Sequence, residues 1–275
     1  MSVAAEPTAP AEHGWYVYGV VEAAAAPPPN ARGIGTPAAP VVVGSLAALV
    51  SRVPLDEYGE EPVRARLEDP AWLEEKVWAH EEVLQNALQT GAVIPFRFLT
   101  LYRDEEELRR FLVERLDDLQ GVLDGVRGMV ELGVKAFVDR DRLEAAVARD
   151  SPAVVDLDAA IAQAESGRAY LLRRRRDQVV REQCARLLAG RAEELHGRLG
   201  EVAAEAAVNP VQTREVSGRT EEMLLNGAYL VPAGDAAFEA TVAALATEQG
   251  SAGVALELTG PWPPYNFVPR DLGAR

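Results

Sequence analysis

The order of strand-like and helix-like segments in the second half of the chain is the feature that most constrains the fold. Apolar and polar side chains alternate with the two-residue period of half-buried strands over residues 129–139 and 254–259. Strand-like segments also cover residues 211–216 and 223–231, which a polar link joins, and helix-like segments precede and follow this pair. The resulting order, β-α-β-β-α-β, predicts a ferredoxin-like antiparallel sheet with helices on one face. In this topology the last strand lies at a sheet edge beside the first.

Extra helices are predicted between the first two of these strands. Short helices over residues 140–149 and up to about residue 163 precede a long helix over roughly residues 168–207. Cys184 lies on the apolar stripe of the long helix, so we expect it to be a small buried side chain. Four consecutive arginines at 173–176 sweep around the same helix. We expect them to form a solvated face with some interdomain salt bridges instead of a phosphate groove.

The first half of the chain predicts a separate α+β domain. Its first strand begins at Trp15 in W-Y-V-Y-G-V-V, and a hairpin turns at Gly44-Ser45. A helix starts at Asp69-Pro70, with the aspartate as its cap and the proline in its first turn, and it ends at Gly91. The apolar stripe of this helix consists of Leu73, Val77, Leu84 and Leu88. His80 falls on that stripe, where we expect a hydrogen-bonded core residue.

Two more elements complete the predicted first domain. Residues 92–102 are predicted to form one strand, with Phe96, Phe98 and Leu99 in the core. Asp104 then caps a helix whose first turn is E-E-E, where the helix dipole favours negative charge. We therefore interpret the acidic run as a helix start and not as a metal site.

The length of 275 residues predicts two domains. We assign residues 14–127 to an N-terminal α+β domain and residues 128–268 to a C-terminal ferredoxin-like domain with the long helix. Residues 1–13 are expected to be a disordered tail, and residues 269–275 a second tail. The N-terminal stretch has neither the basic nor the apolar region of a signal peptide.

Composition argues against several classes of function. The formal charge of −15 repels phosphate backbones and anionic lipid, so neither nucleic acid nor a membrane surface is an expected partner. No apolar run is long enough to span a membrane. One cysteine and three scattered histidines predict no disulfide framework and no metal site, which suits a reducing cytoplasm. The G-I-G at 33–35 lacks the third glycine and the preceding strand of a dinucleotide fingerprint. We predict no cofactor, no catalytic residue and no enzyme.

The C-terminal stretch is the candidate interaction site. Strand 254–259 meets Gly260, and three prolines then restrict the backbone and remove amide donors, so we expect a stiff, unpaired, extended arm. This arm either covers the core or meets a partner. The candidate residues are Thr259, Gly260, Pro261, Trp262, Pro263, Pro264, Tyr265 and Phe267.

An ordered series of motifs resembles the gas vesicle protein GvpL/GvpF family. The series covers about residues 15–268 and ends in a specific piece, T-G-P-W-P-P-Y. Its members are W-Y-V-Y-G-V, V-P-L-D-E-Y-G, W-L-E-E-K-V-W-A-H-E-E-V-L, V-I-P-F-R-F, L-G-V-K-A-F-V-D, S-G-R-A-Y-L-L-R-R, V-N-P, M-L-L-N-G-A-Y-L-V and L-T-G-P-W-P-P-Y-N-F.

The resemblance implies a two-domain α+β protein with a modified ferredoxin-like N-terminal domain and a ferredoxin-like C-terminal domain with extra helices. It also implies an accessory protein of gas vesicle assembly that is located in the cytoplasm before assembly and is a minor component of the gas vesicle. The expected partners are the hydrophobic shell protein and other accessory proteins. A ligand-binding regulatory module with paired ferredoxin-like domains is the alternative.

Overall fold

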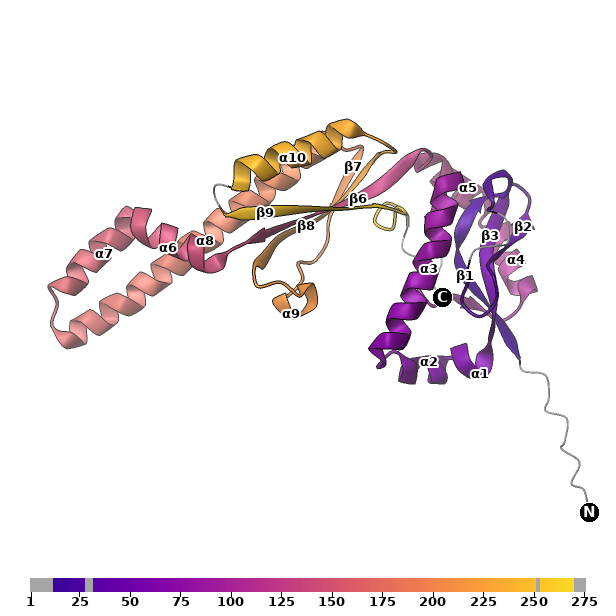
Figure 1. Ribbon diagram of the computed structural model, residues 1–275, viewed down its shortest axis with the longest axis horizontal. Helices are drawn as coiled ribbons and strands as arrows, with labels where there is room; N and C mark the ends of the chain where they lie inside the picture. Colours follow the sequence, from indigo (N-terminus) through magenta and orange to yellow (C-terminus); the bar gives the residue numbers. More distant parts are fainter. Residues whose placement is uncertain (1–11, 28–31, 251–252, 270–275) are drawn as a thin grey trace, which may run out of the picture. The chain divides into compact units, whose positions relative to one another are not determined.

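The computed structural model describes residues 12–27, 32–250 and 253–269 (Figure 1). The predicted tails, residues 1–13 and 269–275, lie almost wholly outside these ranges. Residues 28–31 of the predicted proline-rich loop lie outside them as well. The described part contains two antiparallel sheets, each with helices packed against it, as the α+β prediction requires.

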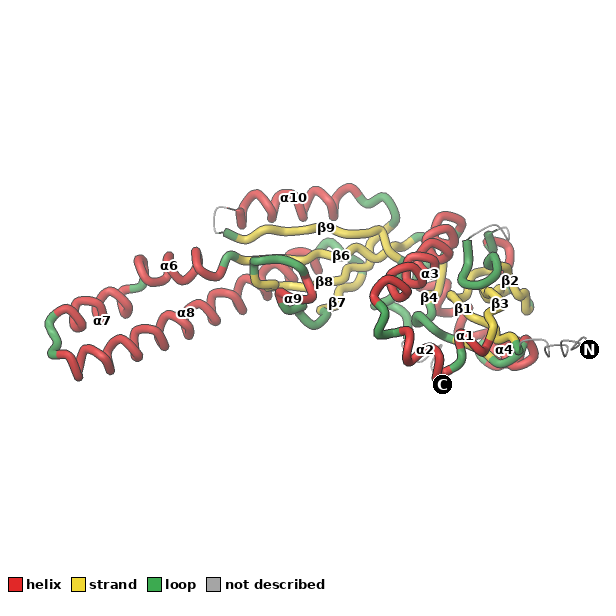
Figure 2. The backbone as a smooth tube through the Cα atoms, turned by 60° about the horizontal axis from the view of Figure 1, so that its bottom comes forward, coloured by secondary structure: helices red, strands yellow, loops and turns green. Residues whose placement is uncertain are grey.

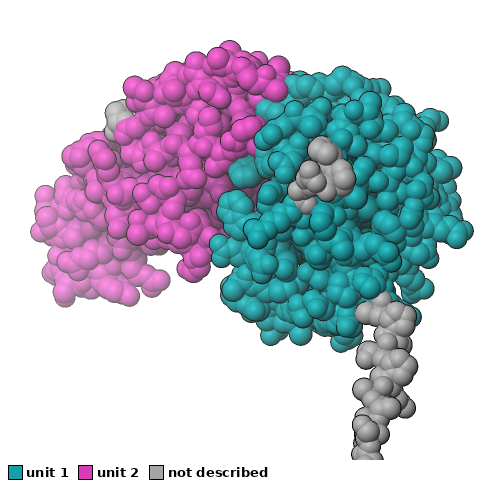
Figure 3. Space-filling model, turned by 45° about the vertical axis from the view of Figure 1, so that its right-hand side comes forward, with its two compact units in different colours: residues 1–130, 262–275 teal, residues 131–261 magenta. Residues whose placement is uncertain are grey.

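The chain divides into two compact units (Figure 3). Unit 1 comprises residues 1–130 and 262–275, and unit 2 comprises residues 131–261. The predicted division had a boundary after residue 127 and placed residues 262–268 in the second domain. The structure groups those residues with unit 1 because their side chains join its hydrophobic core.

The sheet of unit 1 is built around strand β1 (His13–Glu22). Strands β2 (Ala39–Val43) and β3 (Leu46–Pro54) form the predicted hairpin, with Val43 opposite Leu46 across the turn. The strand order is β2-β3-β1-β4, where β4 is Val93–Pro95. A short 3-10 helix (Ala23–Ala25) and a loop, in place of an α-helix, connect β1 to β2. This is the strand order of a ferredoxin-like sheet without its first helix.

A bulge in β1 divides its side chains between two core layers. The pairing of β1 with β3 shifts between Val17 and Gly19, so Tyr18 is the extra residue. Tyr16 and Tyr18 face the helix α3 (Pro70–Thr90), whereas Val17 and Val20 face the helices α4 (Glu105–Glu114) and α5 (Leu116–Gly125). The sheet is therefore covered on both faces, as Figure 2 shows for α3 and α4.

Helix α3 has the predicted ends, and one prediction for its buried face is wrong. The Asp69 carboxylate accepts hydrogen bonds from the backbone N–H groups of Ala71 and Trp72, and Gly91 is the C-cap. The buried residues are His80, Val83, Leu84 and Ala87. Val77, predicted to be in the core, is 38% exposed because the helix turns it away from the sheet. Two short helices, α1 (Leu55–Tyr58) and α2 (Glu60–Arg66), precede α3.

The prediction of a single strand over residues 92–102 is wrong. The chain forms β4, leaves the sheet, and returns as the two-residue strand β5 (Leu101–Tyr102), which pairs with β1. Leu99 between them has a positive φ of 67°, which a strand does not permit. Phe96 is buried as predicted, and Phe98 and Leu99 are partly buried.

The acidic run after Asp104 begins a helix, as predicted. The Asp104 carboxylate accepts a hydrogen bond from the backbone N–H of Glu107 at 2.8 Å. The helix is interrupted at Arg115, so that α4 (Glu105–Glu114) and α5 (Leu116–Gly125) are separate. Their fully buried side chains are Leu108, Leu112, Leu119 and Leu123.

The sheet of unit 2 has the order β7-β8-β6-β9. Its strands are β6 (Met129–Val138), β7 (Glu205–Val208), β8 (Glu222–Pro232) and β9 (Val254–Trp262). The last strand lies at an edge beside the first, as the ferredoxin-like prediction requires. On β8, the ring of Tyr229 contacts His196 of α8 (Ser166–Gly200) and Phe238 of α10 (Ala236–Gly250). Both helices therefore cover the same face of the sheet.

Two predictions for residues 201–216 are wrong. The long helix α8 ends at Gly200, and residues 205–208 form β7. Residues 211–216, predicted as a strand, include most of the short helix α9 (Arg214–Ser217) instead. The helices α6 (Arg140–Asp150) and α7 (Pro152–Ala162) match the prediction and form a hairpin with the first half of α8 (Figure 1). Cys184 is fully buried, as expected.

Candidate functional site

The candidate interaction residues begin inside β9. A β-carbon at Gly133 on β6 would lie 2.5 Å from Oγ1 of Thr259, so the two strands approach closely there. The Thr259 hydroxyl donates a hydrogen bond to the carbonyl oxygen of Gly133 at 3.4 Å. The expected unpaired arm starts later than predicted, because β9 continues through Gly260 and Pro261 to Trp262. Gly260 has a φ of 109°, which favours glycine.

Beyond β9, the arm packs on unit 1. Pro263 and Pro264 are buried, and Val268 joins the core layer that contains α4 and α5. The ring of Tyr265 packs against the other layer, beside α3. These observations support the covering role of the arm for the residues after Trp262. Trp262 itself is 37% exposed, and Phe267 is half-buried.

Tyr265 is held by a carboxylate on α3. Its hydroxyl donates a hydrogen bond to Oε1 of Glu81 at 2.6 Å, across 184 positions of sequence. Burial raises the pKa of Glu81, and the hydrogen bond from Tyr265 partly opposes that shift. The other carboxylate oxygen, Oε2, is buried and has no hydrogen-bond partner among the described residues. The C-terminal arm therefore depends on a carboxylate that the fold has partly removed from water.

His80, the residue next to Glu81, points into the core. Its Nδ1 and the hydroxyl of Tyr16 are hydrogen-bonded at 2.8 Å, and the Tyr16 hydroxyl also accepts the backbone N–H of Leu99 at 3.2 Å. Burial lowers the pKa of His80 to about 4, so the imidazole is neutral near pH 7. Burial raises the pKa of Tyr16 far above its usual range. His80 is thus a hydrogen-bonded core residue, as predicted.

A second buried tyrosine explains the G-I-G segment. The hydroxyl of Tyr18 accepts the backbone N–H of Ile34 at 2.6 Å and is hydrogen-bonded to the Ser51 hydroxyl at 2.8 Å. A β-carbon at Gly33 would lie 2.3 Å from Oγ of Ser51, and Gly35 has a φ of 78°. The two glycines are therefore required by close packing and backbone geometry.

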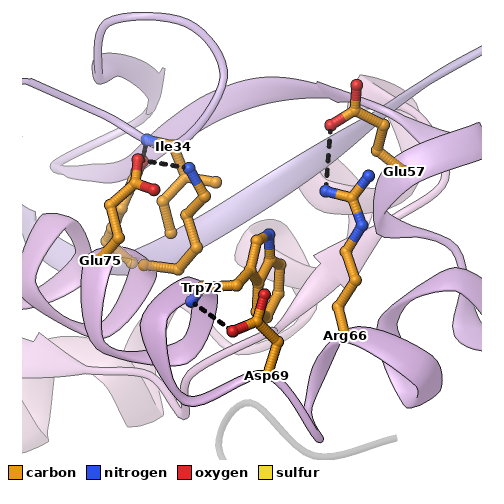
Figure 4. A network of polar contacts seen from close by, with 8 residues as sticks. Ile34, Glu57, Arg66, Asp69, Trp72 and Glu75 are labelled. Carbon is orange, nitrogen blue, oxygen red and sulfur yellow. Dashed lines mark hydrogen bonds and ion pairs between the residues drawn. The ribbon is translucent and has the colours of Figure 1, made fainter.

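Polar contacts also fix the start of α3 (Figure 4). Arg66 pairs with Glu57 at 3.5 Å, and its guanidinium group lies 6.0 Å from the centre of the Trp72 ring. The backbone N–H of Trp72 donates to the Asp69 carboxylate at 3.4 Å. Glu57 on α1 therefore pairs with α2, and Asp69 caps α3. Within the described ranges, no three histidine, cysteine or acidic side chains are grouped as metal ligands.

A model of the family described as "Gas vesicle synthesis protein GvpL/GvpF" matches residues 14–269. The chain belongs to the GvpL/GvpF family. Gas vesicle protein L of Streptomyces sp. (strain CB03234) is 34% identical to it over 242 residues, which cover 88% of this chain and 87% of the relative. Gas vesicle protein F of the same strain is 31% identical over 258 residues, which cover 92% and 98%.

Two solved structures share the fold of this GvpL/GvpF chain. The crystal structure of GvpF from Anabaena sp. PCC7120 covers 93% of this chain with a TM-score of 0.67 and 16% sequence identity; 95% of that protein is matched. GvpF from Microcystis aeruginosa covers 92% with a TM-score of 0.66 and 18% identity, and 98% of it is matched. Among the residues described here, no helix combines the length and the hydropathy that crossing a bilayer requires.

Several exposed apolar side chains of this family member were not predicted from the sequence. Trp78 on α3 is 69% exposed, and Tyr170 and Leu171 on α8 are 57% and 65% exposed. On the edge strand β7, Val208 is 58% exposed. The exposure of Trp78 could have been predicted from helical periodicity, because Trp78 lies outside the apolar stripe that contains Leu84. The sequence favours a strand only weakly at β7, because two of its four residues, E-A-A-V, are alanines, which are depleted in strands.

Each unit also has a hollow lined mainly by apolar side chains. In unit 1 a cavity of about 700 Å³ lies between α1–α2 and the segment around β5, with Leu55, Tyr58, Val63 and Leu99 in its lining. In unit 2 a smaller cavity of about 190 Å³ is lined by Val138, Leu188, Val211 and Met223, among others. Both are concave surfaces that apolar groups can enter.

Proposed function

We propose that this GvpL/GvpF protein is an accessory factor of gas vesicle assembly that binds the hydrophobic shell protein and other accessory proteins. The observation that carries the proposal is the family match over residues 14–269. We place the protein in the cytoplasm before assembly and at the gas vesicle afterwards. The candidate motif residues 259–265 and Phe267 have a positioning role in this proposal: they complete β9 and hold the residues that follow it in unit 1.

The exposed strand β7 is the proposed contact with the shell protein. A hydrophobic subunit that polymerises needs its apolar side chains and strand edges shielded until it is incorporated. Strand β7 pairs with β8 on one side only, at the end of its sheet, and Val208 on it is 58% exposed. An extended segment of the client can add to such an edge by backbone hydrogen bonds, while its apolar side chains contact Val208.

Pull-down of the shell protein tests this contact. Lysine at Ala206 and Val208 places two charges on the edge, which opposes strand addition, so we expect at least tenfold less shell protein to be captured. Val211→Lys with Val216→Lys is the matched control, because it adds the same two charges at side chains that are 55% and 69% exposed and lie outside β7. Equal capture by the edge variant and the wild type would reject β7 as the contact.

Gene deletion tests the assembly role itself. We expect electron microscopy of the deletion strain to show few or no gas vesicles, and expression of this chain to restore them. Normal vesicles in a strain that also lacks any paralogue would contradict the role. This result is independent of β7, because a different surface can carry the same function.

The cavity in unit 1 supports a second candidate function, binding of a small regulatory ligand. Its volume of about 700 Å³ lies within the range of ligand pockets. Thermal unfolding against a panel of metabolites is the test, since a ligand that binds the folded state raises the melting temperature with its concentration. No shift with any metabolite would leave the assembly role as the only proposal.

A further inference from the structure

The first half of α8 carries a basic surface that unit 2 does not neutralise. Residues 166–181 contain six arginines and one acidic residue in a chain whose formal charge is −15. Arg176 pairs with Asp158 of α7 at 2.6 Å, which accounts for one of the arginines at 173–176. Among the described residues, Arg174, Arg175 and Arg181 have no ion pair, and all three are exposed.

Apolar side chains lie within this basic surface. Tyr170 and Leu171 are exposed on α8, each one helical turn before an arginine, at Arg174 and Arg175. Exposed aromatic and aliphatic groups among arginines are the composition of a protein contact, because tyrosine and arginine are enriched at interface centres. The like charges of these arginines repel each other, and an acidic partner would relieve that repulsion.

The chain carries a complementary surface on α3. Glu74, Trp78 and Glu82 follow one another at intervals of four residues, so they form one stripe along the helix. Both glutamates are exposed and have no ion pair among the described residues, and Trp78 between them is 69% exposed. Helix α3 as a whole has four glutamates and one lysine.

The spacing of the charges matches on the two helices. Glu74 and Glu82 are eight residues apart, which corresponds to about 12 Å along a helix. Arg174 and Arg181 are seven residues apart, or about 10.5 Å. Two packed helices can therefore form both ion pairs at once. Trp78 then lies between the pairs, where a guanidinium group can stack on its ring.

We propose that the α8 surface (Tyr170, Leu171, Arg174, Arg175 and Arg181) docks on the α3 stripe (Glu74, Trp78 and Glu82) of a second copy of this protein. The occupant is a second copy because the same chain carries both complementary faces. The assembly depends on ionic strength, because exposed charge pairs are screened by salt. This inference does not rest on the proposed assembly function.

Sedimentation velocity of the full chain tests the self-association. We expect the wild type to self-associate as its concentration rises at about 50 mM salt. At about 500 mM salt we expect its self-association to be at least tenfold weaker. Trp78→Ser removes the central ring from an exposed position and is expected to weaken association without unfolding the chain. A wild type that stays monomeric at low salt and about 100 µM protein would overturn the proposal.

Charge exchange provides the decisive experiment. Arg174→Glu with Arg181→Glu, and separately Glu74→Arg with Glu82→Arg, should each abolish self-association. A mixture of the two variants should associate again, because every altered face then meets an altered face of opposite charge. Arg186→Glu with Arg214→Glu is the control, since it changes the net charge by the same amount as the first variant and lies outside the surface. If the mixture stays monomeric, or if the control abolishes association equally, the proposal fails.

Discussion

At Gly19 the backbone of unit 1 leaves no room for a side chain. A β-carbon there would lie 2.4 Å from the carbonyl oxygen of Ile94 on β4 and 3.0 Å from a methyl group of Leu84 on α3. Because the nearest atom belongs to backbone, the strands must move apart to admit even alanine. We expect Gly19→Ala to destabilise unit 1 by about 1–3 kcal/mol, measured by chemical denaturation.

A second glycine supplies the control for this prediction. Gly121 lies inside α5, and a β-carbon there would meet no atom within 4 Å. Gly121→Ala should stabilise the protein by roughly 0.5–1 kcal/mol, because alanine favours the helix more than glycine does. Equal effects of the two substitutions would show that packing at Gly19 is looser than in the structure.

The bond between Tyr265 and Glu81 sets the attachment of the C-terminal arm. Tyr265→Phe keeps the ring and removes the hydroxyl that donates to Glu81 at 2.6 Å. We expect a loss of about 1–3 kcal/mol in the free energy of unfolding when Glu81 is ionised. The loss should be smaller in acid, where Glu81 is protonated. Protection of the backbone N–H groups of residues 265–268 in hydrogen exchange provides the measurement, and an unchanged exchange rate would contradict the role of this bond.

The buried histidine predicts a dependence of stability on pH. The pKa of His80 is about 4 in the folded protein, compared with about 6.5 in an unfolded chain. As the pH falls from about 6.5 to about 4, only the unfolded state takes up this proton, so the folded state loses about 3 kcal/mol. The raised pKa of Glu81 acts in the opposite direction, because its folded form takes up a proton more readily than its unfolded form.

Comparison with His80→Gln separates the two effects. The substitution removes the histidine titration and leaves Glu81 in place, so the difference between variant and wild type should follow His80 alone. We expect the wild type to lose more stability than the variant between about pH 6.5 and pH 4. Parallel stability curves for the two proteins would show that the imidazole is not buried in its neutral form.

At the scale of elements, two helix starts make a matched pair. The Asp69 side chain caps α3 with hydrogen bonds to two backbone N–H groups. Ser151 occupies the same position before α7, yet its side chain makes no capping bond, and its buried hydroxyl has no hydrogen-bond partner among the described residues. Asp69→Ala should cost about 1 kcal/mol, whereas Ser151→Ala should be neutral or stabilising. Thermal unfolding of the two variants measures these changes in stability. An equal loss of stability for both would contradict the assignment of Asp69 as a cap.

The long periodic elements could be predicted from the sequence, while the short ones could not. Asp69-Pro70 and Gly91 mark the ends of α3 by local chemistry alone. The chain around Leu99 leaves the sheet because its N–H bonds to Tyr16, a residue 83 positions away. Likewise, E-A-A-V favours helix locally, and only pairing with β8 makes it a strand. Tertiary contacts decided both of these cases.

At the candidate site, too, local sequence predicted some features and tertiary contacts decided the others. The residue types of the stretch ending at Phe267 predicted a stiff aromatic arm, because proline restricts the backbone wherever it occurs. The place where Tyr265 binds depends on Glu81 of α3, which is 184 positions away from Tyr265 in the sequence. Nothing in local sequence links the two residues. The docking of the arm on unit 1 therefore required the structure.

For the molecule as a whole, the chain passes between its two units twice. It leaves unit 1 after residue 130 and returns at residue 262, so unit 1 is completed only when the last residues are present. Unit 2 is a continuous segment with its own four-stranded sheet and helices. Folding of unit 1 consequently involves contacts between residues near both ends of the chain.

Truncation after Pro261 tests this organisation. The truncated chain lacks buried Pro263, Pro264 and Val268, and also the bond from Tyr265 to Glu81. Burial of these groups and the hydrogen bond together stabilise unit 1 by about 3–6 kcal/mol. We expect hydrogen exchange to accelerate across α3 and β1, while β6 and β8 in unit 2 keep their protection. Truncation after residue 269 is the control, because it also shortens the chain but keeps Pro263, Pro264, Tyr265 and Val268. Loss of protection in unit 2 alone would instead assign residues 262–268 to the second domain, as the sequence had predicted.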